Sequence, residues 1–296
     1  MSYGGTKIKK LIVVSVVLAV LMAASAYAQS QDFFALVQTG TPQSVQDAID
    51  KGANIKARDS VGRTPLMLAA QNNEDPEVIT TLLKAGSDVN ARDPNGYTAF
   101  TYAVWHNPSI GVIKAFLDAG IDINAQDNYG ATYLITGAGH NPNPEVTTAL
   151  LKAGSDVNFQ SSPDGYTALI WAAGNNQNAE VITILLKGGA DINAKDSSGW
   201  NALMYAAKMN PNAAVITLLL NGGLNIEFRG GLGETPLMVA ARSNPNPKVI
   251  ITLLNAGADA KAKDNAGRTA FDYAKSNYGL RVSGADAYRQ LQEASQ

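Results

Sequence analysis

Seven glycines recur along the chain at nearly constant intervals, and each begins a similar run of residues. Two of these runs are Gly62-Arg-Thr-Pro-Leu-Met-Leu-Ala-Ala70 and Gly233-Glu-Thr-Pro-Leu-Met-Val-Ala-Ala241. The interval is 34 residues in five cases and 35 in the one that ends at Gly165. A period of this size is typical of solenoids, so we expect function on a surface and not in a catalytic pocket. The glycines are Gly62, Gly96, Gly130, Gly165, Gly199, Gly233 and Gly267.

Each copy is expected to contain two helices joined by a short turn. An apolar run follows the glycine, and the Asn after it is expected to end the first helix in the left-handed backbone conformation. Asn and Pro then form a turn in which Asn143 or Asn246 can cap the second helix, with Pro at its first position. The helix-ending residues are Asn73, Asn107, Asn141, Asn176, Asn210 and Asn244.

The second helix of each copy has one apolar face. Val is followed by two Leu at i+4 and i+5, as in Val181, Leu185 and Leu186, and this spacing places them on one side of a helix. A Gly ends the helix, and an Asp-x-x-Gly turn leads to the next copy as a protruding hairpin or extended loop. The helix-ending glycines are Gly86, Gly120, Gly154, Gly189, Gly223 and Gly257.

A single copy cannot fold alone. Ordering its backbone costs about 1 to 2 kcal/mol per residue, whereas roughly eight apolar side chains contribute about 1.5 to 3 kcal/mol each. Copies must therefore stack, and the terminal copies must face water. We predict an N-terminal capping repeat at 29–61, where Asp50 replaces the second Leu, and six repeats at 62–266. Residues 267–296, with an insertion around 280–284, are predicted to be a C-terminal capping repeat and tail.

The first 28 residues differ from the rest of the chain. Three Lys precede an apolar run at 11–24, and Ala26-Tyr27-Ala28 has the small residues that a signal peptidase accepts. We predict a signal peptide at 1–28, cleaved between Ala28 and Gln29, and a protein that is periplasmic or secreted. The alternative is an uncleaved inner-membrane anchor, but the run of 14 residues is shorter than the roughly 20 that a spanning helix needs. Contact with the membrane is expected only through this segment.

Composition argues against several classes of function. The formal net charge of −2 at pH 7 gives no electrostatic attraction for nucleic acid. The chain contains no Cys, so neither a disulfide framework nor a thiolate metal site is possible. Stability in an oxidising compartment must therefore come from packing.

The repeated residues resemble the ankyrin repeat family. Gly-x-Thr-Pro-Leu-x-x-Ala-Ala, the later Val-x-x-x-Leu-Leu and an ending of the Gly-Ala-Asp-Val-Asn-Ala type recur in phase from Asp32 to about Gln292. The resemblance implies an all-α repeat fold, an ankyrin solenoid of stacked helix-turn-helix units whose hairpin loops project at right angles. It also implies a concave face that binds other proteins.

Two features depart from the family pattern. The period of 34 residues exceeds the usual 33, and we expect the extra residue in the turn between the helices. The family commonly places a His after Thr-Pro-Leu, and this chain lacks it, so any hydrogen-bond ladder made by that His is absent. The equivalent positions hold Met67, Thr101, Ile135, Ile170, Met204, Met238 and Asp272.

The resemblance places two sets of positions on the concave face: those beside each repeat-opening Gly and those after the Ala pair. Aromatic residues and Arg are frequent at binding hot spots. Five aromatic candidates cluster in the middle copies: Tyr97, Trp105, Tyr129, Tyr166 and Trp200. They either form an exposed patch or pack between repeats together with Tyr102, Trp171 and Tyr205. The candidate partner-binding residues are Arg63, Tyr97, Trp105, His106, Tyr129, His140, Tyr166, Trp200, Lys208, Met209 and Arg242.

The residues offer little for catalysis or metal binding. His106 and His140 occupy equivalent positions and could approach each other, but two His without a third ligand are a poor metal site. The stretch from Asp88 to Gly96 resembles a calcium loop only superficially, because it lacks the alternating spacing and the terminal Glu. No nucleophile elbow, phosphate loop or zinc-protease motif is present. We expect that the protein is not an enzyme and that it binds neither a cofactor nor a metal ion.

The sequence therefore predicts an exported, bacterial-type ankyrin repeat protein, expected to be a monomer, that binds a protein partner non-covalently through its concave groove. A secreted inhibitor, immunity protein or host-directed effector is the second class of function. A structural spacer of the envelope without a tight ligand is the third. Binding that depends on the groove aromatics would favour either of the first two over the spacer.

Overall fold

The computed structural model describes residues 31–296, and the predicted signal peptide with its cleavage site at Ala28 and Gln29 lies outside them. The described chain begins with a helical segment at 31–39. Its residues contain one isolated bridge, between Gln126 and Thr132, and no strand. The helices that follow are α2 (Pro42–Asp50), α3 (Pro65–Asn72), α4 (Pro76–Lys84), α5 (Ala99–His106), α6 (Ile110–Asp118), α7 (Tyr133–His140), α8 (Pro144–Lys152), α9 (Ala168–Asn175), α10 (Ala179–Lys187), α11 (Ala202–Met209), α12 (Ala213–Asn221), α13 (Pro236–Ser243), α14 (Lys248–Asn255), α15 (Ala270–Ser276), α16 (Tyr278–Ser283) and α17 (Ala285–Ala294).

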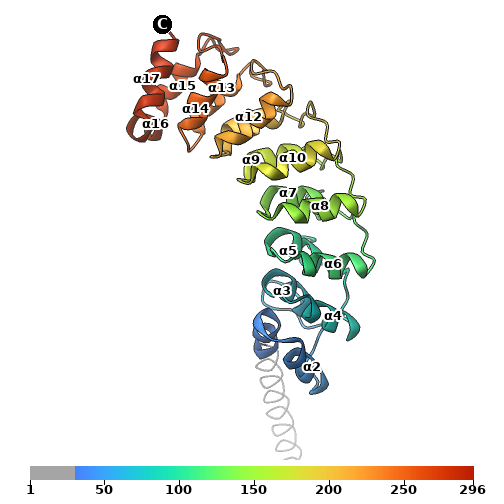
Figure 1. The fold of residues 1–296 in the computed structure, drawn as a ribbon. Coiled ribbons are helices and arrows are strands. Elements are labelled where there is room, and N and C mark those ends of the chain that lie inside the picture. Colours follow the sequence, from blue (N-terminus) through green and yellow to red (C-terminus); the bar gives the residue numbers. More distant parts are fainter. Residues whose placement is uncertain (1–30) are drawn as a thin grey trace, which may run out of the picture.

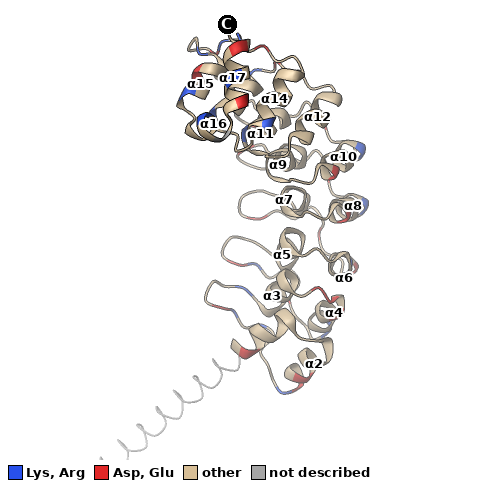
Figure 2. Cartoon of the chain, turned by 60° about the vertical axis from the view of Figure 1, so that its left-hand side comes forward, with Lys and Arg blue, Asp and Glu red and all other residues tan. Residues whose placement is uncertain are grey.

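Helix pairs stack along one direction into a curved solenoid (Figure 1). The first helices α3, α5, α7 and α9 lie on the concave side of the stack, and the second helices α4, α6, α8 and α10 lie on the convex side. Loops between successive repeats project beyond the first helices (Figure 2). A groove is therefore bounded by the first helices and the projecting loops. The predicted all-α stack of helix-turn-helix units is confirmed.

A capping residue fixes where each first helix begins. In α7 the Thr132 side chain accepts a hydrogen bond from the amide of Ile135, which satisfies a donor that no helical carbonyl reaches. Asn201 takes this place in α11 and accepts from the amide of Met204. The other caps of this kind are Thr64, Thr98, Thr167, Thr235 and Thr269.

The Asn residues that end the first helices do not have the predicted left-handed conformation. Asn141 has φ −77° and ψ 122°, and among the described residues only Gly has a positive φ. The buried side chain explains its presence, because Nδ2 donates to the carbonyl oxygens of Val104 (3.0 Å) and Asn107 (2.9 Å) in the preceding repeat. Its Oδ1 accepts from the amide of Asn143 at 3.0 Å. Equivalent bonds are made by Asn73, Asn107, Asn176, Asn210 and Asn244.

These six residues, called the asparagine ladder below, tie each turn to the turn before it. Two other local predictions are confirmed. Asn143 caps α8 with Pro144 at the first helical position. The glycines that end the second helices all have positive φ, for example 93° at Gly154, a conformation that suits Gly because it lacks Cβ.

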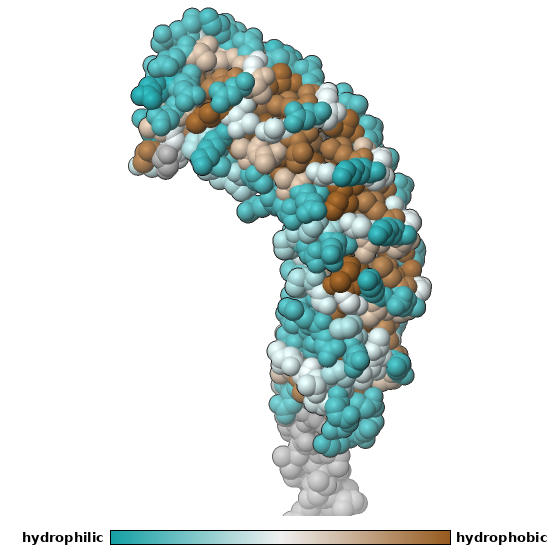
Figure 3. Space-filling view, viewed as in Figure 1, coloured by the Kyte–Doolittle hydropathy of each residue, from teal (hydrophilic) through white to brown (hydrophobic). Residues whose placement is uncertain are grey.

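The core runs without interruption between the two helix layers and is closed at both ends. Phe33 and Phe34 are buried at the N-terminal end. At the C-terminal end most of the residues around the predicted insertion lie in α16 (Tyr278–Ser283), and α17 buries Leu291. Partly exposed apolar side chains gather over the second helices of the middle and C-terminal repeats (Figure 3). None of the helices within residues 31–296 has the length and apolar character needed to span a membrane.

Candidate functional site

Three positions in each repeat supply side chains to the groove: the residue before the N-cap, the residue one turn into the first helix, and a residue near the end of that helix. Counted from Gly62, the second, fourth and fifth repeats place mostly aromatic residues there, and the third places small ones. The three positions hold Tyr97, Tyr102 and Trp105 in the second repeat, Ala131, Thr136 and Gly139 in the third, Tyr166, Trp171 and Gly174 in the fourth, and Trp200, Tyr205 and Lys208 in the fifth.

The aromatic residues of these repeats and His140 form a continuous chain of ring contacts, called the aromatic chain below. Centroid separations of about 4.5 to 7 Å suit favourable aromatic pairs. Tyr129 joins the chain through Tyr97 at 6.2 Å. The separations are 5.7 Å for Tyr97 and Trp105, 4.8 Å for Trp105 and His140, 5.8 Å for His140 and Trp171, 5.1 Å for Trp171 and Tyr166, 5.6 Å for Tyr166 and Tyr205, and 5.4 Å for Tyr205 and Trp200.

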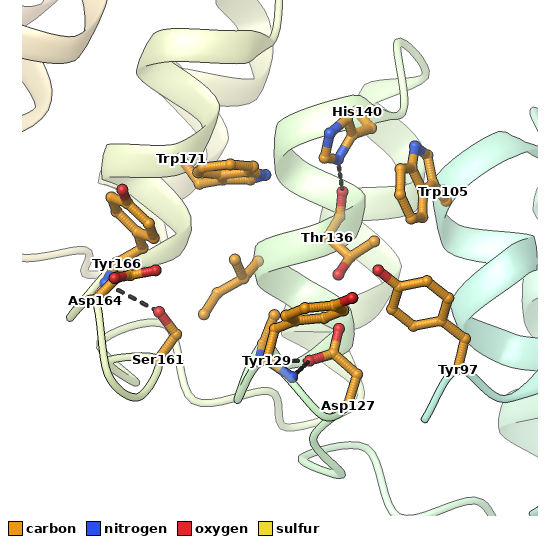
Figure 4. A pocket seen from close by; sticks show the side chains of 12 residues that line it. Tyr97, Trp105, Asp127, Tyr129, Thr136, His140, Ser161, Asp164, Tyr166 and Trp171 are labelled. Carbon is orange, nitrogen blue, oxygen red and sulfur yellow. Dashed lines mark hydrogen bonds between the residues drawn. The ribbon is translucent and has the colours of Figure 1, made fainter. Parts of the chain in front are cut away.

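Part of the aromatic chain lines an open cavity of about 330 Å³ over the third repeat, called the central cavity below. Tyr97 and Trp105 lie on one side of it and Tyr166 and Trp171 on the other, with Tyr129 between them (Figure 4). Gly139 allows Trp171 to approach α7, since a Cβ there would overlap the indole ring. The cavity therefore exists because small residues of one repeat lie between large residues of its neighbours.

Five aspartates hold the loops that project into the groove, and they are called the turn aspartates. In each of them, Oδ1 accepts hydrogen bonds from the backbone amides of the residues two and four positions later. In Asp196, Oδ2 also accepts from the Tyr205 hydroxyl at 2.6 Å. Burial and this hydrogen bond raise the pKa of Tyr205, so the hydroxyl stays a donor. The turn aspartates are Asp59, Asp93, Asp127, Asp196 and Asp264.

Trp105 lies between the protein's two histidines, His106 and His140. Its ring stacks on His106, with centroids 5.0 Å apart and an interplanar angle of 7°, and contacts His140 on the next repeat. His140 Nδ1 lies 3.1 Å from the Thr136 carbonyl oxygen, which can only accept, so Nδ1 is the donor. Burial lowers the pKa of His140, and burial together with the charge of His140 lowers the pKa of His106. Both shifts favour the neutral form of the imidazole ring.

A second cavity, of about 590 Å³, lies further along the groove. Trp200, Lys208 and Arg242 line it. The Lys208 ammonium lies 5.4 Å from the centroid of the Trp200 ring, and Arg242 Nη1 pairs with buried Glu234 Oε1 at 3.2 Å. The basic groups of this C-terminal cavity contrast with the central cavity, whose lining has no Lys or Arg.

The residues between 31 and 296 contain no group of three His, Cys, Asp or Glu side chains placed to hold a metal ion. The family described as ankyrin repeats (3 copies) matches residues 33–127 and 134–230, and the one described as ankyrin repeats (many copies) matches 218–274. The chain belongs to the ankyrin repeat family. Ankyrin repeats imply a protein–protein interaction module, and the family is a non-enzymatic binding scaffold.

The fold also resembles solved ankyrin structures. The human ASB11 ankyrin repeat domain matches with a TM-score of 0.65 and 23% sequence identity, over 79% of this chain and 99% of that one. At this level of identity the match establishes the fold alone. No curated protein matches the chain.

The two cavities of the ankyrin groove contain eight of the eleven residues predicted from the sequence. Tyr97, Trp105, Tyr129, His140 and Tyr166 line the central cavity, and Trp200, Lys208 and Arg242 line the second. Tyr129 is 60% exposed, whereas the other four predicted aromatic residues are half-buried. They both pack between repeats and present a surface, so each of the two sequence interpretations holds in part. Contact with a partner remains a prediction.

The other three predicted residues lie outside both cavities. His106 is held against Trp105. Arg63 Nε pairs with Asp59 at 2.9 Å, and Met209 packs half-buried against the ankyrin core. These contacts give each of the three a local structural role.

Sequence reasoning missed seven of the residues that line the central cavity, among them Trp171, which was expected only to pack, Asp127 and Asp164. A usable signal was present. When the ankyrin repeats are aligned, two of the three groove positions read aromatic, small and aromatic across the second, third and fourth repeats. A small residue between two large ones predicts a gap in a stack.

Proposed function

We propose that the protein is exported to the periplasm, where it binds a protein partner through its concave ankyrin groove. The aromatic chain supports this proposal most strongly. Protein interfaces are enriched in Tyr and Trp and depleted of charge at their centres. The first helices α5, α7 and α9 contain no Lys, Arg, Asp or Glu (Figure 2), so the helical floor in the middle of the groove is uncharged, and the Asp residues there lie on the loops.

The export part is tested by expressing the tagged full-length chain in a Gram-negative host. Fractions are separated, the N-terminus is read by mass spectrometry, and co-purifying proteins are identified. A chain that starts at Gln29 in the periplasmic fraction with a stoichiometric protein would support the proposal. An intact N-terminus in the membrane fraction would indicate an anchor instead, and the absence of any partner would favour the envelope spacer.

The groove part is tested with Trp200→Ala. We expect affinity for the identified partner to fall by about 2 kcal/mol, the typical loss at a hot spot, with a small change in melting temperature. Leu220→Ala on α12 is the control, because Leu220 is also partly buried but lies on a second helix and lines neither groove cavity. A large loss of stability with unaltered affinity would show that Trp200 belongs to the core and not to the interface.

A further inference from the structure

Asp127 differs from the other four turn aspartates. Its Oδ1 accepts the amides of Tyr129 (2.8 Å) and Ala131 (3.0 Å), as the pattern requires. In the other four, Oδ2 accepts from a side chain four or nine residues later in the sequence, which is Arg63, Tyr102, Tyr205 or Tyr273.

Thr136 occupies the position in the third repeat that Tyr102 and Tyr205 occupy in theirs. Thr is too short to reach the carboxylate, and among residues 31–296 no side chain donates to Asp127 Oδ2. Asp127 lines the central cavity. The substitution that opens the cavity therefore also leaves a carboxylate oxygen without a donor at its wall.

A second carboxylate reaches the cavity through an insertion. The 35-residue interval that ends at Gly165 has its extra residue in the loop at 161–165, where the sequence is Ser-Ser-Pro-Asp-Gly. This loop places Asp164 at the edge of the central cavity. The described part of the chain provides no hydrogen-bond donor to its carboxylate, and the backbone carbonyl of Asp164 is the atom that bonds Ser197.

We propose that the central cavity binds one basic side chain, Lys or Arg, of the protein partner. This inference rests on the proposed protein-binding function and names the chemistry of the contact. Two carboxylates, Asp127 and Asp164, face a cavity whose lining contains no Lys or Arg. A cation above Trp or Tyr rings is attracted by their electron-rich faces, and both carboxylates can accept its hydrogen bonds.

The size of the cavity agrees with this ligand. Its volume of about 330 Å³ is at the small end of the range of roughly 300 to 1,000 Å³ found for ligand pockets, which suits one long side chain and not a helix or strand. The rings of Trp105 and Trp171 would contact the aliphatic stem, as apolar surfaces commonly do with Lys and Arg. A carbohydrate could also stack on these rings, but it would leave the two carboxylates without a countercharge.

The test uses the full-length protein with Trp200→Phe, so that fluorescence reports on Trp105 and Trp171. The probes are acetyl-Gly-Gly-X-Gly-Gly-amide peptides in which X is Arg, Lys or citrulline. We expect the tryptophan fluorescence to change saturably with the Arg and Lys peptides, with dissociation constants on the order of 1 mM. The neutral citrulline peptide should bind about tenfold more weakly. Equal affinity for Arg and citrulline, or no saturation by about 10 mM, would overturn the proposal. So would saturation by the neutral disaccharide chitobiose without any response to the Arg peptide.

Two variants locate the binding. Thr136→Tyr introduces the side chain that the second and fifth repeats already accommodate, and it should fill the cavity, donate to Asp127 Oδ2 and abolish the peptide response. Asp127→Asn keeps the Oδ1 acceptor and removes the charge, so it should weaken Arg-peptide binding about tenfold. Asp93→Asn is the matched control, because Tyr102 already occupies Asp93 Oδ2 at 2.8 Å, and it should leave the affinity unchanged. If Thr136→Tyr does not fold, the comparison of Asp127→Asn with Asp93→Asn decides. Wild-type affinity in Asp127→Asn would refute the inference.

This inference and the proposed function fail in different ways. If partner binding requires Trp200 but not Asp127, the groove is the interface, and the proposed contact with a basic side chain of the partner is wrong. If the Arg peptide binds as expected but no partner depends on the groove aromatics, the cavity chemistry is right and the protein-binding proposal is wrong.

Discussion

At the scale of single residues, the asparagine ladder ties each repeat to the next by buried hydrogen bonds. The turn after each first helix buries carbonyl groups that no helical amide can reach, and such groups need partners. Asn supplies a two-proton donor and an acceptor from one short side chain. Each ladder residue therefore satisfies carbonyls of the preceding repeat while its oxygen holds the turn of its own.

Asn141→Ala tests the ladder. The substitution leaves the carbonyls of Val104 and Asn107 and the amide of Asn143 without this partner. Because a buried group left unsatisfied costs about 1 to 3 kcal/mol, we expect a loss of about 2 to 4 kcal/mol in the free energy of unfolding, measured with urea. Asn175→Ala is the control, since Asn175 is exposed and bonds only the Trp171 carbonyl. Equal effects of the two substitutions would contradict a structural ladder.

The histidines give the stability a pH dependence. The folded pKa values of His106 and His140 lie below the unfolded value, so the unfolded chain binds more protons and the free energy of unfolding falls as pH drops below about 6.5. His106, Trp105, Trp171 and the Thr136 carbonyl surround His140. We expect the urea midpoint to decrease between pH 7.5 and 5.5, and to decrease less in His140→Gln. A midpoint that is independent of pH in this window would show that the rings titrate normally.

At the scale of helices, the sequence predicted correctly those structural features that depend on the residues of a single repeat. The Asn143 cap of α8, the apolar Val and Leu face of α10 and the glycines that end the second helices follow from local rules, and the sequence predicted all of them. The conformation of Asn141 and the position of Trp171 were not, because each depends on the neighbouring repeat: Asn141 on carbonyls of the preceding one, Trp171 on the space left by Gly139. Contacts between repeats are invisible to a pattern read within one repeat.

The second helices should be most sensitive at the Leu that faces the core. Leu185 of α10 is fully buried, so Leu185→Ala leaves a cavity and is expected to cost about 2 to 5 kcal/mol of unfolding free energy. Leu186, one residue later, is only partly buried, and Leu186→Ala should cost clearly less. Urea denaturation of both variants measures the difference. A small effect at Leu185 would be incompatible with the stacked-repeat core.

At the scale of the whole molecule, each repeat contacts only its neighbours, so stability along the solenoid is local. The two ends must be closed for the repeats beside them to stay folded. At the C-terminus this closure comes from α16 and α17, with α17 packing on α14 and α15. Leu280 and Leu291 are buried there, and the ring of Tyr288 contacts Phe271 at 5.2 Å.

Ending the chain after Ser276 should therefore unfold the nearest repeats and spare the middle. Losing the burial of Leu280 and Leu291 removes about 1.5 to 3 kcal/mol for each side chain, and the α14 and α15 surfaces become exposed. In hydrogen exchange we expect amide protection to fall in α13 to α15 and to persist in α7 to α9, because solenoids open region by region. Tyr278→Ser in the full chain is the control, since Tyr278 is 76% exposed and should change nothing. Uniform loss of protection from α3 to α15 would mean that the stack unfolds as one cooperative unit, and unchanged protection in α14 would mean that the final two helices do not act as a cap.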